Sequence, residues 1–398
     1  MLYICYLLIL LLCFNNLLLA FTLSSSLDIF RIPIQFLLTG ALILQLLKKN
    51  KRNSHISVPF VMLIVVFIIY IVCQLLLFSN NILNEFSDST FGLIVLLLFY
   101  IIPFKKTKEI EQKFKSASYI FLVLSSVLFL YSKSPLFHVS LKMYQWPLFL
   151  NSIYYVICII PFCLLFSKGT KQALVMFGLS LICVLLSNKQ GAFIALLLSI
   201  ICYFVINRHR INSSNILPFI FGIVFLYIIG SFAYNLGLGM SGKDIDMLKG
   251  FSSMEKDGGS GRLDIYNMVL SLVNNSGISN ILFGHGGVNA VAKDIGISAH
   301  NDFLEILYDF GLMGFLLYLI MIGYLIKTFL KSLKQHSFIA PSFGASILIF
   351  LTMSAVSHVM FILKYSLLLF SFWGITIRII QNEKTKDCFN SSSSIANS

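Results

Sequence analysis

The sequence predicts an all-α, polytopic membrane protein with about 12 transmembrane helices, and three observations predict it. Of its 398 residues, 58% are hydrophobic and only 11% are charged, whereas soluble domains carry about 25% charged residues. The apolar residues gather in runs of roughly 17–25 residues, the length that a helix needs to cross a bilayer. Lysine and arginine lie in short clusters between these runs, a distribution that orients membrane proteins.

The order of the apolar runs predicts the place of each transmembrane helix. We expect these helices to begin near residues 2, 30, 58, 88, 118, 150, 172, 191, 216, 308, 338 and 359. A basic cluster follows each even-numbered run, at 48–52, 105–115, 168–171, 207–210 and 327–334, and in the tail at Arg378, Lys384 and Lys386. Because basic loops remain on the cytoplasmic side, both termini are predicted to be cytoplasmic.

This alternation divides the chain into four parts. Residues 1–235 hold helices 1–9, residues 236–302 form a large loop on the outer face, and residues 303–380 hold helices 10–12. The Ser-rich segment 381–398 is expected to be a disordered cytoplasmic tail. An outer loop of about 65 residues exceeds a simple connection, which indicates a function or a structure of its own. Within it a tight turn is predicted at Gly284, Gly286 and Gly287.

Charge and cysteine usage narrow the classes of function. The net charge of +13 does not indicate a nucleic-acid partner, because the basic residues are spread over the ends of the apolar runs. Of the eight cysteines, all but Cys388 lie inside apolar runs. Neither a disulfide framework nor a cysteine-rich metal site is therefore predicted, and we expect no cofactor.

The outer loop contains an arginine next to glycines, in the stretch GGSGRLDIYN at 258–267. Apolar residues after Arg262 recur at helical spacing, which predicts a helix that begins here. A helix start offers free N–H groups to an anion, and a guanidinium matches two phosphate oxygens at once. Arg262 is therefore a candidate for holding a phosphate; the alternative is a solvated arginine on an interfacial helix.

A second polar motif ends the loop, in the stretch SAHNDFLEILYDFGLMG at 298–314. His300 and Asn301 stand at the start of a predicted helix, which places His300 at the outer membrane boundary. A neutral imidazole there accepts a proton from a hydroxyl near neutral pH. Asp302 and Glu305 lie close enough in the sequence for either carboxylate to orient the imidazole of His300. The alternative is a histidine that only caps the helix.

A third polar element is the turn between the seventh and eighth apolar runs, SNKQGA at 187–192. Lys189 in this turn is either an anchor to lipid headgroups or a second contact to phosphate. Gln190 follows it, directly before the Gly-Ala pair.

Taken in order, these motifs resemble the O-antigen polymerase and O-antigen ligase superfamily of bacterial envelope glycan assembly. A polar turn precedes a Gly-Ala helix, a long outer loop carries a Gly-Arg helix, and His-Asn precedes FLEILYDFGLMGFLLYL. The resemblance covers roughly residues 175–325. It implies a helical membrane fold with a C-type glycosyltransferase-like arrangement, in the plasma (inner) membrane of a bacterium.

The resemblance also implies roles for single residues. The family's Gly-Arg arginine, which engages the pyrophosphate of a polyprenyl-linked glycan, matches Arg262. Its loop histidine, which activates the acceptor hydroxyl, matches His300. Gln190 stands where the family usually has an arginine before Gly-Ala, so Lys189 is the substitute, as a point charge without the fork of a guanidinium. Lys189, Gln190 and Asn301 are thus assigned to substrate binding, and no metal is implied.

The expected function is that of a polymerase of lipid-linked O-antigen or of capsular or exopolysaccharide repeat units. Its expected partners are undecaprenyl-diphosphate-linked donor and acceptor glycans, membrane lipids, a chain-length regulator and a flippase. One alternative is an O-antigen ligase, which transfers glycan to a lipid A core. Another is a polysaccharide transporter or flippase, but such proteins place polar groups at mid-membrane in repeated halves, whereas here they gather on the predicted outer face.

Overall fold

Every regular element in the described part of the computed structural model is an α-helix. The structure describes residues 1–22, 31–47, 57–79, 82–102, 107–132, 152–167, 170–187, 189–207, 262–357, 359–360 and 363–395. The all-α class predicted from the sequence is therefore confirmed for these residues.

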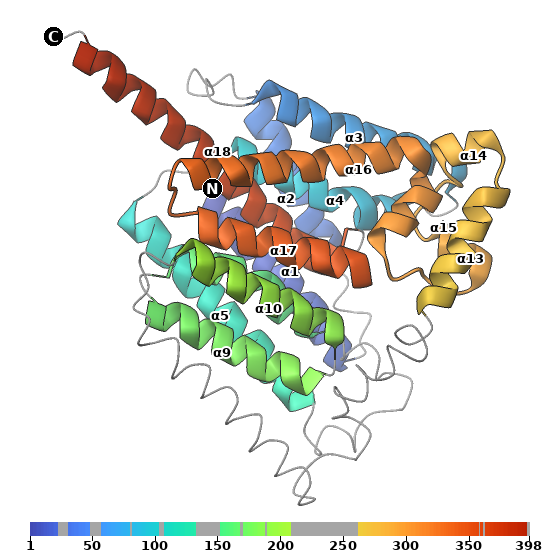
Figure 1. Cartoon of the computed structure of the whole chain (residues 1–398), viewed down its shortest axis with the longest axis horizontal. Helices are drawn as coiled ribbons and strands as arrows, with labels where there is room; N and C mark the ends of the chain where they lie inside the picture. Colours follow the sequence, from blue (N-terminus) through green and yellow to red (C-terminus); the bar gives the residue numbers. More distant parts are fainter. Residues whose placement is uncertain are drawn as a thin grey trace, which may run out of the picture.

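The helices lie side by side as a bundle, with a group of shorter helices at one end (Figure 1). In chain order, those before the outer loop are α1 (Leu2–Thr22), α2 (Arg31–Leu47), α3 (Val58–Phe78), α4 (Ile82–Ile101), α5 (Lys108–Ser132), α8 (Ile153–Leu165), α9 (Thr170–Ser187) and α10 (Gln190–Ile206). Those that follow are α13 (Arg262–Asn275), α14 (Ile278–Phe283), α15 (Ala290–Ile295), α16 (Asp302–Lys334), α17 (Ala340–Val356) and α18 (Leu363–Ile395).

The apolar runs of the sequence coincide with these helices. Each predicted span matches one of them except the ninth, which begins near residue 216 and lies outside the described residues. Three described helices are long and apolar enough to cross a membrane, namely Val58–Phe78, Lys108–Tyr131 and Asp302–Lys334, and several others are apolar but shorter. The predicted count of twelve spans remains a prediction.

The outside of the bundle carries large apolar side chains. On α2 and α3 the residues Phe36, Leu44, Leu47, Leu76 and Leu77 are each 62–75% exposed. A soluble monomer rarely shows contiguous apolar surface of this kind, whereas hydrocarbon accommodates it. The surface thus fits a bundle whose solvent is lipid.

The core is built around α8, all of whose residues are buried. This helix packs against α5, α9, α17 and α18. At a second close interface, a Cβ on Gly374 of α18 would come within 3.0 Å of the backbone of α4. Small residues let membrane helices pack closely, so the backbones of α18 and α4 come into direct contact at this glycine.

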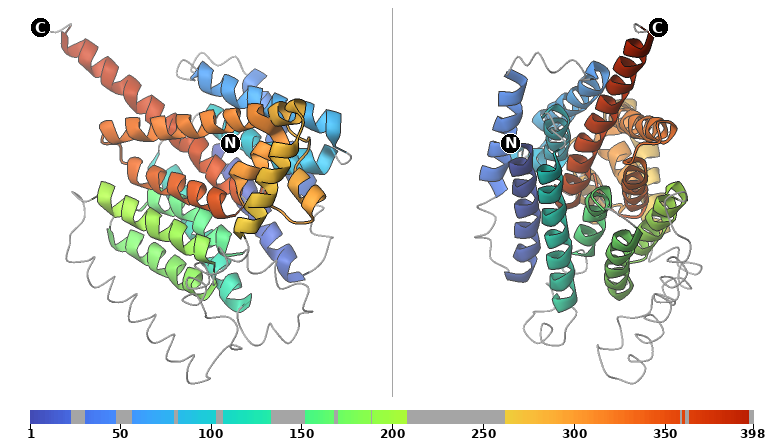
Figure 2. Two further views of the ribbon diagram at one scale, coloured as in Figure 1. Left: turned by 45° about the vertical axis from the view of Figure 1, so that its right-hand side comes forward. Right: turned by 90° about the vertical axis from the view of Figure 1, so that its left-hand side faces the viewer.

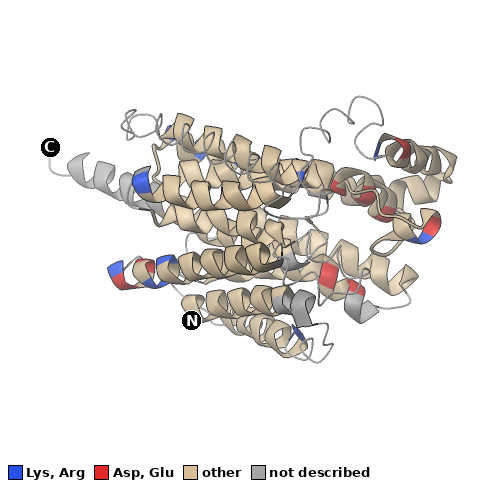
Figure 3. Cartoon of the chain, turned by 90° about the horizontal axis from the view of Figure 1, so that it is seen from below, with Lys and Arg blue, Asp and Glu red and all other residues tan. Residues whose placement is uncertain are grey.

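The two ends of the bundle differ in charge (Figure 3). At one end α16 begins, α17 ends and α13, α14 and α15 cluster, as Figure 1 and the left view of Figure 2 show; we call it the site end. The described acidic residues of this end are Glu85, Asp88, Asp264, Asp294, Asp302, Glu305 and Asp309. The opposite, basic end carries Lys108, Lys113 and Lys115 at the start of α5 and Lys331 and Lys334 at the end of α16, together with Glu109 and Glu111. The basic end is the one that the sequence predicts to face the cytoplasm.

Two segments add detail to the sequence-based boundaries. The described part of the outer loop, residues 262–300, folds into α13, α14 and α15 and so has the structure of its own that its length indicates. At the C-terminus α18 continues to Ile395, and the expectation of a disordered tail at 381–398 stays a prediction.

Candidate functional site

The C-terminal turn of α17, residues 355–357, joins two of the motifs found in the sequence; we call it the α17 turn. The carbonyl oxygen of Ala355 accepts hydrogen bonds from the Tyr266 hydroxyl (3.3 Å) and from the Asn301 side-chain amide (3.1 Å). Tyr266 lies one helical turn after Arg262 on α13, and Asn301 follows His300. The Arg262 helix and the His300 segment therefore meet at one backbone carbonyl.

The third motif packs against the same turn. A Cβ on Gly191 would overlap the side chain of Val356, so the glycine allows the start of α10 to approach α17 closely. Lys189 immediately precedes α10 and Gln190 is its first residue, and both are half-buried. The Gly-Ala stretch thus places Lys189 and Gln190 at the α17 turn.

Arg262 is the first residue of α13 and is half-buried. The helix begins where the sequence predicts and has Asp264 in its first turn, whereas the preceding glycines lie outside the described residues. At the α17 turn, the Tyr154 side chain of α8 is hydrogen-bonded to Ser357. No carboxylate in the described parts of the chain forms an ion pair with Arg262. Tyr266, one turn further along α13, ties the start of this helix to the α17 turn.

His300 is exposed and has a left-handed backbone, with φ of 52°. Residues other than glycine adopt this conformation rarely. Its neighbours fix it: the Ala299 N–H donates to Glu305 (2.8 Å), and Asn301 caps α16 by accepting from two N–H groups of the first turn. Such backbone is found often at functional sites, where the surroundings enforce it.

Three carboxylates of α16 connect separate segments of the site end through hydrogen bonds. Asp302, Glu305 and Asp309 are buried, and each accepts hydrogen bonds from backbone N–H groups. The segments they hold are, respectively, 359–360, 298–299 and 289–291. Glu305 thereby anchors the residue next to His300, and Asp302 anchors the chain between α17 and α18.

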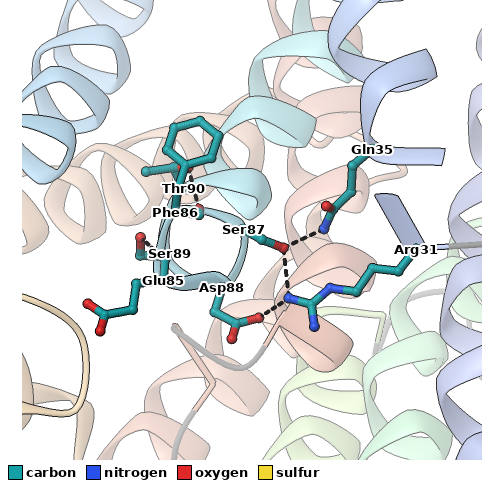
Figure 4. A network of polar contacts seen from close by, with 8 residues as sticks. All are labelled: Arg31, Gln35, Glu85, Phe86, Ser87, Asp88, Ser89 and Thr90. Atoms are coloured by element: carbon teal, nitrogen blue, oxygen red, sulfur yellow. Dashed lines mark hydrogen bonds and ion pairs between the residues drawn. The ribbon is translucent and has the colours of Figure 1, made fainter. Parts of the chain in front are cut away.

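A second polar network lies at the starts of α2 and α4 (Figure 4). Arg31 pairs with Asp88 and donates to the Ser87 hydroxyl (2.7 Å), which also accepts from Gln35 (2.6 Å). One turn earlier on α4, Glu85 accepts from the Val288 N–H (3.2 Å) and pairs with Lys293 (3.1 Å). The start of α4 therefore connects α2 to the α14–α15 segment.

All five residues selected from the sequence lie around the α17 turn: Arg262, His300, Asn301, Lys189 and Gln190. Sequence reasoning missed Tyr154, Tyr266 and the turn itself. Tyr154 lies in an apolar run and the turn in another, and neither carries a motif. Only their long-range contacts reveal them.

Apolar helices, a lipid-compatible surface and a group of polar and cationic residues at one end of the bundle are the features of a class of protein, the helical membrane proteins. Within that class, residues 175–319 match the family model described as O-antigen ligase, so the chain contains a domain of this family. The matched segment includes the five residues selected from the sequence, whereas Tyr154 and the α17 turn lie outside it. Glycan transfer of the ligase or polymerase type in envelope polysaccharide assembly is the activity associated with this family. No match is found among curated proteins.

Proposed function

We propose that the protein is a polymerase of lipid-linked O-antigen, capsular or exopolysaccharide repeat units that works at the outer face of the plasma membrane. The observation that supports this most is the meeting of three sequence motifs at the α17 turn. A cation, an imidazole and polar amides gathered at one end of an apolar bundle suit a substrate with a charged diphosphate, a sugar and a lipid tail.

Arg262 binds the diphosphate of the donor. Its guanidinium, which has no carboxylate partner among the described residues, supplies two parallel N–H donors to phosphate oxygens, and its charge stabilises the negative charge that grows on the leaving group. Lys189, at the start of α10, adds a second positive charge. Gln190 and Asn301 contribute amide groups to sugar or phosphate oxygens.

His300 acts as the general base. The acceptor hydroxyl oxygen attacks the anomeric carbon of the donor while His300 takes the hydroxyl proton. The bond from that carbon to the diphosphate oxygen breaks, and its electron pair leaves with the diphosphate. The products are a longer lipid-linked glycan and polyprenyl diphosphate, and the imidazolium then releases its proton to water.

The site end faces outward in this proposal. The basic end carries the clusters that favour the cytoplasm, so both termini are cytoplasmic and the donor enters from the outer leaflet. Undecaprenyl-diphosphate-linked glycans serve as donor and acceptor, and a flippase and a chain-length regulator are the expected protein partners.

The first prediction concerns Arg262 and His300. We expect Arg262→Ala to lower chain extension by ~10²–10³-fold, and His300→Asn to lower it by ~10²–10⁴-fold. Asparagine tolerates the left-handed backbone at 300, so this change removes the imidazole with little conformational cost. The glycan ladder of a strain that carries each variant measures extension.

Matched controls exist for both residues. His336 has a similar left-handed φ, 48°, at the far end of α16, and Asn274 is an exposed residue of α13. His336→Asn and Asn274→Ala are expected to keep normal ladders. Wild-type ladders in His300→Asn or Arg262→Ala, at normal protein level, remove that residue from the mechanism.

An O-antigen ligase is the second candidate function, because the matching family model carries that description. The two functions share a site and differ in acceptor. In a strain that lacks this chain, single repeats on the surface anchor indicate lost polymerisation, whereas long chains on the polyprenyl carrier indicate lost ligation. A transporter would instead leave chain length normal in the Arg262→Ala strain.

A further inference from the structure

Glu305, in the first turns of α16, holds the chain immediately before His300. One of its carboxylate oxygens, Oε1, accepts a hydrogen bond from the Ser298 hydroxyl (2.7 Å) and another from the Ala299 backbone N–H (2.8 Å). Glu305 is buried, whereas His300 is exposed. We propose that Glu305 is a positioning residue for glycan transfer, which fixes the backbone before His300 so that the imidazole meets the acceptor hydroxyl. The proposal rests on the proposed function and adds a residue to it.

The backbone of His300 requires support of this kind. Its φ of 52° is left-handed, a conformation that is unfavourable for a residue with a side chain and persists only where the surroundings enforce it. On the C-terminal side, Asn301 fixes the chain as the cap of α16 and through its hydrogen bond to the Ala355 carbonyl. On the N-terminal side, Glu305 fixes Ala299. Without the second support, His300 can return to an ordinary backbone conformation, which points its imidazole in another direction.

The hydrogen bonds of the two carboxylates near His300 lead to different segments. Asp302 accepts from the N–H groups of Val359 (3.0 Å) and Met360 (3.0 Å), in the chain between α17 and α18. The hydrogen bonds of Glu305 lead to Ser298 and Ala299. We therefore assign the positioning of His300 to Glu305, which acts through the backbone.

The geometry at Glu305 supplies a conservative variant. Both hydrogen bonds end on the same oxygen, Oε1, and the side-chain carbonyl oxygen of a glutamine can accept both of them. Glu305→Gln therefore keeps the support and removes the negative charge, whereas Glu305→Ala removes the support.

Asp309, four residues later on α16, supplies a matched control. It is also buried, and it also accepts from backbone N–H groups, those of Asn289 (2.8 Å) and Val291 (3.3 Å). Asp309→Ala therefore removes a buried carboxylate that anchors backbone at the site end, as Glu305→Ala does. The hydrogen bonds it removes lie in segment 289–291 and not directly before His300.

The test compares these variants in the full-length protein in proteoliposomes. The substrate is undecaprenyl-diphosphate-linked repeat units isolated from a strain that lacks this chain. We expect Glu305→Ala to lower kcat by ~10–10²-fold, the size of effect that a misplaced catalytic group produces, with the KM for the lipid-linked substrate unchanged. Glu305→Gln is expected to retain most of the wild-type kcat. Asp309→Ala is expected to lower thermal stability and to keep the wild-type kcat of the folded protein.

Three results overturn the proposal. The first is a wild-type kcat in Glu305→Ala. The second is a loss in Glu305→Gln as large as that in Glu305→Ala, because the acceptor oxygen is then not what matters. The third is an equal loss of kcat in Asp309→Ala, which would indicate a general loosening of the site end.

Ser298→Ala serves if Glu305→Ala reduces the yield of folded protein. It removes one of the two hydrogen bonds from the donor side and leaves the buried carboxylate in place. We expect it to lower kcat by ~2–10-fold, the factor that corresponds to one hydrogen bond. A wild-type kcat in Ser298→Ala would then overturn the proposal.

The outcomes separate this inference from the proposed function. An inactive His300→Asn variant beside a fully active Glu305→Ala variant overturns the role of Glu305 and leaves the transfer mechanism standing. A fully active His300→Asn variant overturns the role of His300 as the base, whatever Glu305→Ala does.

Discussion

Asn301 uses both ends of its side-chain amide. The oxygen accepts from the N–H groups of Phe303 (2.9 Å) and Leu304 (3.2 Å), and the nitrogen donates to the Ala355 carbonyl. One side chain therefore begins α16, ties it to α17 and sits beside His300. Its assignment to substrate binding stays a prediction, and the contacts give it a structural role as well.

The residue-scale prediction separates these two contacts. Asn301→Asp keeps an oxygen for the cap at a helix start that favours negative charge, but loses the N–H that reaches Ala355. Asn301→Ala loses both and should lower stability by about 1 kcal/mol through the missing cap. We expect thermal unfolding of the purified protein to rank wild type, then Asn301→Asp, then Asn301→Ala. A midpoint for Asn301→Ala equal to that of the wild type would contradict the cap.

At the scale of elements, the glycine turn at 284–287 packs against a break in α16 at Gly311; we call this contact the joint. Gly284, Gly286 and Gly287 have φ between 75° and 88°, and Gly311 interrupts α16 with a φ of 64°. A Cβ on Gly311 would overlap backbone atoms of Gly284 and Leu282. The backbone N–H groups of residues 285 and 286 donate to the carbonyls of Tyr308 and Asp309.

The carbonyl freed at this break finds a partner on α3. The Tyr70 hydroxyl lies 2.7 Å from the Phe310 carbonyl oxygen and 3.2 Å from that of Phe283. A buried carbonyl without a hydrogen-bond partner would destabilise the fold. The hydrogen bond from Tyr70 removes this cost at the Phe310 carbonyl. The joint directs the first turns of α16, which carry the three anchoring carboxylates, toward the α13–α15 group.

The element-scale prediction concerns Gly311. Gly311→Ala forces a side chain into a left-handed position and into the facing backbone, and should lower stability by at least ~2 kcal/mol. Gly323→Ala lies on the same helix with open space around its Cβ, and should instead raise stability by up to ~1 kcal/mol. Chemical unfolding of the detergent-solubilised variants measures both. Equal stability of the two would show that the joint is not required.

At the scale of the whole molecule, the two ends of the bundle differ in the balance of their charges. The site end holds the buried carboxylates and the cations of the candidate site. The basic end holds the lysines in the first turns of α5 and in the last turn of α16. A substrate with a lipid tail in the bilayer can present its diphosphate to such a polar end while its sugar remains in water.

The whole-molecule prediction is one of topology. Ser279 on α14 is exposed at the site end and Lys334 is exposed at the basic end. In intact cells a membrane-impermeant thiol reagent should label Ser279→Cys and leave Lys334→Cys unlabelled, with the parent chain as the measure of labelling at native cysteines. Labelling of Lys334→Cys alone would put the site end in the cytoplasm and rule out the proposed use of an outer-leaflet donor.

Local sequence patterns were sufficient to predict most of the helices of this protein. Run length and composition predict the helices because a membrane span must be long, apolar and internally hydrogen-bonded. The start of α13 at Arg262 and of α16 after Asn301 follow from helical spacing and capping residues, which act over a few residues. The candidate site residues were selected from the sequence as well, since cations, imidazoles and glycines are conspicuous in apolar sequence, and their roles stay predictions.

The arrangement of the helices in space was decided by tertiary packing. Ala355 lies 89 residues from Tyr266 and 54 from Asn301, and no pattern in either stretch links them. Tyr154 looks like any aromatic residue of a membrane span until the fold places its side chain beside Ser357. Local sequence sets helix formation because backbone hydrogen bonds join near neighbours. Which helix ends meet depends instead on side chains that fit across the whole bundle, a property of the folded chain that no single segment contains.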